Sequence, residues 1–132
     1  SFLAASARAK APLTSRGFSS SFAVVTGIED PGKGFKSVDI RKIAEAVDTI
    51  VILMGASVAE ELLKEVALIK GYDEAAVVVI NATLPGERII YGSLRDLVEL
   101  AKMGLIENPA VIIIGSSVRL RERMLESVGE KM

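Results

Sequence analysis

Four places in this chain put a chemically useful residue beside a turn or a strand end. Arg16 lies in a Thr-Ser-Arg-Gly turn before a run of serines, and a guanidinium can pair bidentately with carboxylates. Met54 ends an apolar run before Gly55, and its flexible thioether can mould itself to a ligand. The turn Asn81-Ala82-Thr83 follows a second apolar run, and Ala110 begins a third. Plain structural roles compete at each place: surface charge, core methionine, hairpin loop and buried strand start.

Several kinds of chemistry are excluded by residues that the chain lacks. With no Cys and no His, it has no disulfide, no thiolate or imidazole metal site and no Ser-His-Asp triad. No catalytic residue is therefore assigned.

The composition also bounds the partners of the chain. A formal net charge of −1 over 132 residues does not suit a nucleic-acid interface, which needs a basic face. The apolar runs at 75–80 and 110–114 have the length of strands and are too short to cross a bilayer. We therefore expect neither a nucleic acid nor a membrane as partner.

Apolar periodicity predicts the elements that would position these residues. Helices are expected where apolar residues recur every three or four positions, and strands where short β-branched runs are bounded by turn residues. The expected helices are 1–11, 40–47, 58–69 and 94–101, and the expected strands are 22–26, 49–54, 75–81, 87–91 and 110–114.

Turn and capping residues support these boundaries. Ser37 or Asp39 can cap the second helix, while Ser57 with Glu60 and Ser93 with Asp96 have the spacing of capping boxes. A short loop with Pro and Gly joins the strands 75–81 and 87–91, which predicts a hairpin and so a mixed sheet. The fold class is α/β: one domain with a five-stranded mixed sheet flanked by helices.

Four segments in register resemble a known family. They are LTSRGFSSSFAVVTGIEDPG at 13–32, VILMG at 51–55, Asn-Ala-Thr at 81–83 with Glu87-Arg88 behind it, and PAVIIIG at 109–115 followed by Val-Arg-Leu-Arg. Their order and spacing resemble the carboxyl-terminal half of the tetrapyrrole methylases, most closely the members that methylate uroporphyrinogen III. The resemblance runs from the first residue to about residue 123.

The resemblance implies a division of labour between two domains. Family members hold S-adenosylmethionine in a cleft between two α/β domains, dimerise and use no metal. Residues 1–16 would then be an interdomain linker helix and turn, and 17–132 the carboxyl-terminal domain, with the amino-terminal domain absent from this chain. We expect a cytoplasmic homodimeric methyltransferase as the full-length protein, which releases S-adenosylhomocysteine, and an inactive fragment on its own.

The resemblance also implies roles for particular residues. Met54, Ala82, Thr83 and Ala110 match positions that contact the cofactor, and Met54 also approaches the tetrapyrrole. Arg16 matches a substrate position and would bind carboxylates of uroporphyrinogen III. Arg8 is expected to be a solvated surface charge.

This chain departs from the family pattern in three places. Ser15 and Ile28 stand where the family has histidines, so acid–base chemistry by those imidazoles is impossible here. Ala82 stands where Gly is usual, and its Cβ would disfavour a positive φ. Two alternatives therefore remain: a methyltransferase acting on a later precorrin, or a non-catalytic small-molecule-binding module on the same scaffold.

Overall fold

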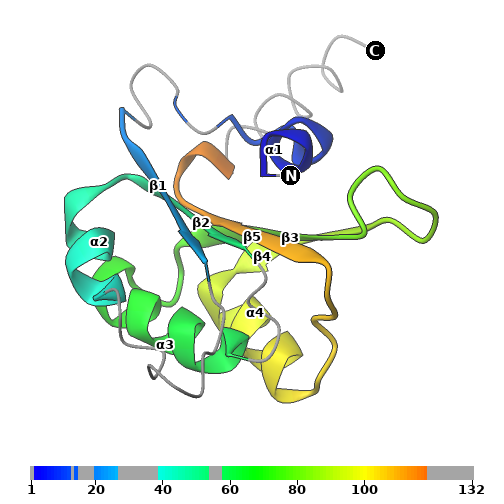
Figure 1. Ribbon diagram of the computed structural model, residues 1–132. Helices are drawn as coiled ribbons and strands as arrows, with labels where there is room; N and C mark the ends of the chain where they lie inside the picture. The colour runs from blue at the N-terminus through cyan, green and yellow to red at the C-terminus, as the bar shows by residue number, and fades with distance from the viewer. Residues whose placement is uncertain (1, 13, 15–19, 27–38, 54–57, 119–132) are drawn as a thin grey trace, which may run out of the picture.

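The computed structural model describes residues 2–12, 14, 20–26, 39–53 and 58–118 (Figure 1). Helices and strands follow one another in the predicted order, and each predicted element is confirmed within these residues. The helices and strands are α1 (Phe2–Ala9), β1 (Phe22–Thr26), α2 (Ile40–Ala46), β2 (Thr49–Leu53), α3 (Ala59–Lys70), β3 (Ala75–Ile80), β4 (Arg88–Ser93), α4 (Leu94–Lys102) and β5 (Ala110–Ile114).

The five strands form one mixed sheet in the order β1-β2-β5-β3-β4. β1 and β2 are parallel, and β3 and β4 form the predicted antiparallel hairpin. β5 lies in the middle and runs antiparallel to both of its neighbours, β2 and β3. The sheet is therefore mixed for two reasons, since the last strand as well as the hairpin reverses direction.

Helices cover both faces of this sheet, but unequally. Of the four helices that the structure describes, α2, α3 and α4 lie on one face and α1 lies on the other (Figure 1). Side chains alternate along each strand, so Ile50 and Ile52 enter the core beneath the three helices, while Val51 packs toward α1. Both cores are apolar, which explains why the strands read as continuous apolar runs.

α1 packs on the sheet through small residues. Ala5, Ala9 and Ala11 are all 0% exposed and share a core cluster with Val77 and Val79. Because alanine side chains are short, the backbone of α1 can lie close to the strands. The hydroxyl of Tyr91 in β4 also donates to the carbonyl of Ala9 at 2.8 Å, which ties α1 to the hairpin.

The predicted helix caps have different outcomes. The capping box of Ser93 and Asp96 is confirmed, because each side chain accepts from the backbone of the other residue. Asp39 caps α2 by accepting from two backbone amides. The N-cap residue of α3 is Val58, whose apolar side chain cannot cap, and Ser57 lies outside the described residues, as does the predicted loop 29–37.

Serine side chains hold the start of β1 against the start of β2. Ser20 donates to the Asp48 carboxylate from its backbone N–H at 2.9 Å and its hydroxyl at 3.1 Å, and Ser21 Oγ accepts from the Asp48 amide. The pKa of Asp48 is lowered, chiefly by the backbone N–H of Ser20. This junction lies at the edge of the sheet opposite the ends of β2 and β3.

Among the residues that the structure describes, no helix is long and apolar enough to cross a membrane.

Candidate ligand-binding site

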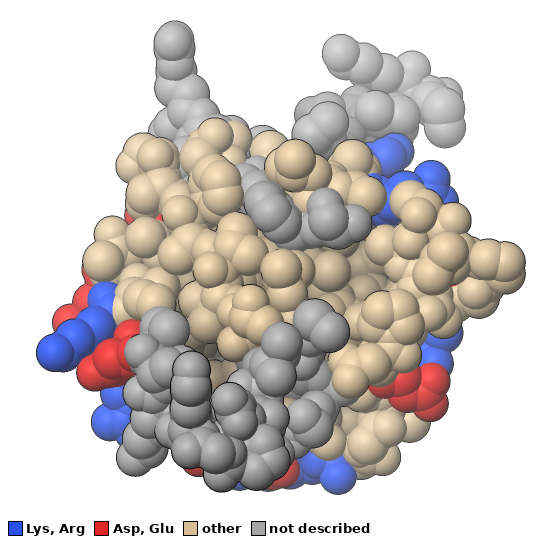
Figure 2. Space-filling model, viewed as in Figure 1, with Lys and Arg blue, Asp and Glu red and all other residues tan. Residues whose placement is uncertain are grey.

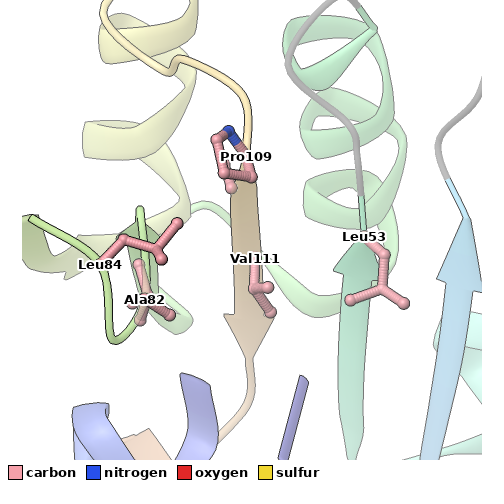
Figure 3. Close-up of a pocket in the computed structure, with 7 residues that line it drawn as sticks. Leu53, Ala82, Leu84, Pro109 and Val111 are labelled. Carbon is pink, nitrogen blue, oxygen red and sulfur yellow. The ribbon is translucent and has the colours of Figure 1, made fainter. Parts of the chain in front are cut away.

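A pocket of about 360 Å³ lies at one edge of the sheet (Figure 3). The register places the end of β2, the end of β3 and the start of β5 at this edge, because Leu53 pairs with Val111 and Ile80 with Ala110. Strands and the loops that follow them build the pocket together. Its lining residues are Leu53, Val79, Ala82, Leu84, Pro109, Ala110 and Val111.

All the side chains that line the pocket are apolar. Leu53, Val79 and Val111 come from three neighbouring strands and belong to the core on the α1 side of the sheet, while Leu84 is half exposed at the rim. In the space-filling view, residues other than Lys, Arg, Asp and Glu occupy the middle of the described surface on the face shown, and the charged residues lie toward its margins (Figure 2). Such a surface can bind the apolar face of a flat ligand, and its polar contacts must come from the backbone.

The β3–β4 loop forms one wall of the pocket, and its backbone is strained. Leu84 N–H donates to the Asn81 carbonyl at 2.9 Å, and Glu87 N–H to the Leu84 carbonyl at 3.2 Å. Asn81 and Thr83 have positive φ angles of 52° and 64°. Asparagine tolerates this left-handed region, but a β-branched threonine is a genuine outlier there.

The expectation that a Cβ at position 82 disfavours a positive φ is confirmed. Ala82 lies between the two left-handed residues and does not itself have a positive φ. The left-handed conformations of the turn occur at Asn81 and Thr83, so an alanine fits at position 82 without backbone strain.

An ion pair fixes this loop from the side of α1. The N–H of Thr83 donates to the Glu87 carboxylate at 2.6 Å. The guanidinium of Arg8 binds both oxygens of the same carboxylate, with its shortest N–O distance 2.7 Å. These contacts lower the pKa of Glu87, with the Arg8 hydrogen bond as the largest cause, and raise that of Arg8. Arg8, expected to be a solvated charge, is exposed but paired.

The peptide groups of Ala110 are oriented by the β3–β5 ladder. Asn81 N–H donates to the Pro109 carbonyl at 3.0 Å, just outside the Ile80–Ala110 pair. That pair is therefore the non-hydrogen-bonded kind of an antiparallel ladder. The N–H and C=O of Ala110 consequently point away from β3 and toward the β2 side, at the level where the described part of β2 ends at Leu53.

The structure brings some of the predicted residues together. Ala82 in the β3–β4 loop and Ala110 at the start of β5 line the same pocket, and Thr83 lies in the same loop as Ala82. Met54 follows the pocket residue Leu53 directly, but Met54 and Arg16 lie outside the described residues, as do Ser15 and Ile28.

Sequence reasoning missed the apolar floor of the pocket and the residue that holds its loop. Leu53 and Pro109 stand in segments that the family resemblance had already singled out, so their neighbours Met54 and Ala110 were the available signal. Glu87 also stands in such a segment, but its pairing with Arg8 left no signal in the sequence, because the two residues lie 79 positions apart. In the part of the chain that the structure describes, no group of three or more Asp and Glu residues is placed to hold a metal ion.

Fold and pocket together define an α/β domain with an apolar-lined pocket at the edge of a mixed sheet. The chain belongs to the tetrapyrrole (corrin/porphyrin) methylases, whose family model matches residues 1–98. The resemblance drawn from the four sequence segments is thereby confirmed, and so is the fold class.

Individual relatives point the same way. The chain is 38% identical over 111 residues to a uroporphyrinogen-III C-methyltransferase of Methanocaldococcus jannaschii, covering 83% of this chain and 45% of the relative. A solved uroporphyrin-III C-methyltransferase of Thermus thermophilus, complexed with S-adenosylhomocysteine, is 32% identical with a TM-score of 0.68; the match covers 84% of this chain and 46% of that one.

A cobalt precorrin-4 methyltransferase is 25% identical with a TM-score of 0.75, over 88% of this chain and 48% of that one. The chain thus spans about half the length of these relatives.

Proposed function

We propose that this chain is the carboxyl-terminal part of an S-adenosylmethionine-dependent uroporphyrinogen-III C-methyltransferase, which makes precorrin-2 for sirohaem and corrinoid synthesis. The observation that carries the proposal is the apolar pocket at the sheet edge, in a chain 38% identical to a relative of that name. The higher identity to this relative than to the precorrin-4 enzyme favours uroporphyrinogen III over a later precorrin as substrate.

The residues of the pocket fit one half of the cofactor. Pockets for small molecules have volumes of about 300–1,000 Å³, and 360 Å³ suits a half-site that a second domain completes. Ala110 offers an N–H and a C=O that can recognise an adenine edge, while Ala82 and Thr83 lie in position for backbone contacts to the ribose and amino-acid part. Leu53, Val79 and Val111 would hold the ring and exclude water.

The reaction needs positioning and a dry site more than acid–base groups. S-adenosylmethionine would supply a methyl group. The bond between this methyl group and the sulfonium sulfur would break, its electron pair would stay on the sulfur, and the methyl group would bond to an electron-rich ring carbon of the tetrapyrrole. In this chain, Met54 would line the meeting point of cofactor and tetrapyrrole, and Arg16 would pair with substrate carboxylates. The missing histidines at 15 and 28 are compatible with such a role.

The wider organisation belongs to the same proposal. Residues 1–16 would form the linker from an amino-terminal domain that supplies the rest of the cleft, and 17–132 the second domain. The full-length enzyme would be a cytoplasmic homodimer that uses no metal. Light scattering of the full-length protein and an activity assay with a metal chelator would test the dimer and the metal independence.

The experiment that tests the proposal is methyl transfer by the full-length protein. With methyl-labelled S-adenosylmethionine, label should appear in uroporphyrinogen III, and calorimetry should detect S-adenosylhomocysteine binding. Methyl transfer only to a later precorrin would show that the substrate is that precorrin and not uroporphyrinogen III. If the protein neither transferred the methyl group nor bound S-adenosylhomocysteine, the non-catalytic binding module would be the remaining alternative.

A variant that fills the pocket tests whether the cofactor binds there. Ala82→Leu puts extra bulk into the pocket wall, and overpacking of about 1–3 kcal/mol corresponds to a loss of about 5- to 150-fold in cofactor affinity. Ala46→Leu, on the exposed end of α2, is the matched control and should bind as wild type. Equal cofactor affinities in the two variants would show that the cofactor does not bind in this pocket.

A further inference from the structure

The pocket loop is held in a conformation that its own sequence does not favour. Thr83 has a φ of 64°, and such a β-branched residue persists in the left-handed region when its surroundings hold it there. The two backbone hydrogen bonds inside the loop involve Asn81, Leu84 and Glu87 and leave the Thr83 N–H to another acceptor. That acceptor is the Glu87 carboxylate, 2.6 Å away.

The Glu87 carboxylate is in turn immobilised from outside the loop. Arg8 donates to both of its oxygens, from Nε at 3.0 and 3.1 Å and from Nη2 at 2.7 Å. The Glu87 side chain is 15% exposed, against 55% for Arg8, so the carboxylate is the better-shielded partner. Charge-assisted hydrogen bonds of this geometry are stronger and more directional than neutral ones.

Arg8 is carried by a helix that is itself fixed on the sheet. The buried alanines of α1 pack against β3, and Tyr91 Oη donates to the Ala9 carbonyl. Both polar ties, from Arg8 and from Ala9, end on the β3–β4 hairpin. A shift of α1 would therefore act on the hairpin loop through the contacts of Arg8 and Ala9.

We propose that Glu87 is a positioning residue: clamped by Arg8 of the linker helix, its carboxylate holds the Thr83 amide and keeps the 81–87 loop preformed for the cofactor. This inference rests on the proposed function, since the cofactor contacts of Ala82 and Thr83 are part of it. It adds a coupling between the linker helix and cofactor affinity. Glu87 and Arg8 act through the loop and do not touch the ligand.

The test compares three variants of the full-length protein with a control ion pair. Glu87→Ala removes the acceptor, Glu87→Gln keeps its shape without its charge, and Arg8→Ala frees the carboxylate. Arg95→Ala is the matched control, because Arg95 also pairs with a carboxylate, that of Asp73 at 2.5 Å, away from the pocket. Melting temperatures establish that every variant is folded.

Two readouts are measured on each variant. The first is amide hydrogen exchange at Thr83 in the free protein, and the second is the Kd for S-adenosylhomocysteine by calorimetry. We expect exchange to accelerate and affinity to fall by about tenfold in Glu87→Ala, with smaller effects in Glu87→Gln and Arg8→Ala. Arg95→Ala should change neither.

The outcomes separate this inference from the function on which it rests. Unchanged exchange at Thr83 in Glu87→Ala would overturn the clamp, and faster exchange with unchanged affinity would overturn its role for the cofactor. A wild-type protein that does not bind S-adenosylhomocysteine would instead contradict the proposed function, and the positioning role with it.

Discussion

The left-handed conformation of Thr83 predicts that replacing this residue stabilises the protein. A β-branched residue in this region costs roughly 1–2 kcal/mol, which glycine would avoid. Glycine also has more backbone freedom in the unfolded chain, and losing this freedom on folding offsets roughly 0.5–1 kcal/mol of the gain. Thr83 is exposed, so little packing is lost with its side chain. The net effect of Thr83→Gly is a stabilisation of about 0.5–1 kcal/mol, which raises the melting temperature by about 2–4 °C.

A second substitution and a control make this prediction sharper. Thr83→Asn should stabilise by a similar amount, because asparagine tolerates the left-handed region without the added backbone freedom of glycine. Asn81→Gly should be neutral or slightly destabilising, since Asn81, with a φ of 52°, already suits its conformation. Scanning calorimetry measures all three. A lower melting temperature in both Thr83 variants would refute the claim that this residue is strained.

Three further predictions concern the rest of the domain. Ser93→Ala removes the N-cap of α4 and should lower the free energy of unfolding by about 0.5–2 kcal/mol in urea titrations. Leu97→Ala empties a fully buried site beneath the sheet and should cost about 2–5 kcal/mol by the same assay. The lowered pKa of Asp48 stabilises the fold above the ordinary value of 3.8, and this contribution disappears as the pH falls through the lowered pKa. Asp48→Asn should therefore flatten the acid limb of the stability profile, and an unchanged limb would exclude a contribution from this carboxylate.

Much of the fold could be predicted because local signals and tertiary structure agree. The β-branched runs of β2, β3 and β5 are buried on both faces, so a continuous apolar run identifies each of them. The capping box at Ser93 is equally local, because its partners lie three residues apart. At α3, the N-cap residue Val58 makes no side-chain cap hydrogen bond, and Ser57 of the predicted box lies outside the described residues.

The parts that escaped prediction depend on contacts between distant segments. Nothing local to β5 says that it inserts between β2 and β3, which is what brings Ala110 to the same edge as Ala82. The pair of Arg8 and Glu87 likewise exists only once α1 lies on the sheet. The positive φ angles of Asn81 and Thr83 were not predicted either, whereas the absence of a positive φ at Ala82 agrees with the presence of its Cβ.

The central claim is that the pocket at the ends of β2 and β3 is one half of the cofactor site. The most direct test is a crystal structure of the full-length protein with S-adenosylhomocysteine. We expect the adenine beside the main chain of Ala110, with the ribose or amino-acid part against Ala82 and Thr83. Ligand density at another site, with this pocket unchanged and empty, would contradict it.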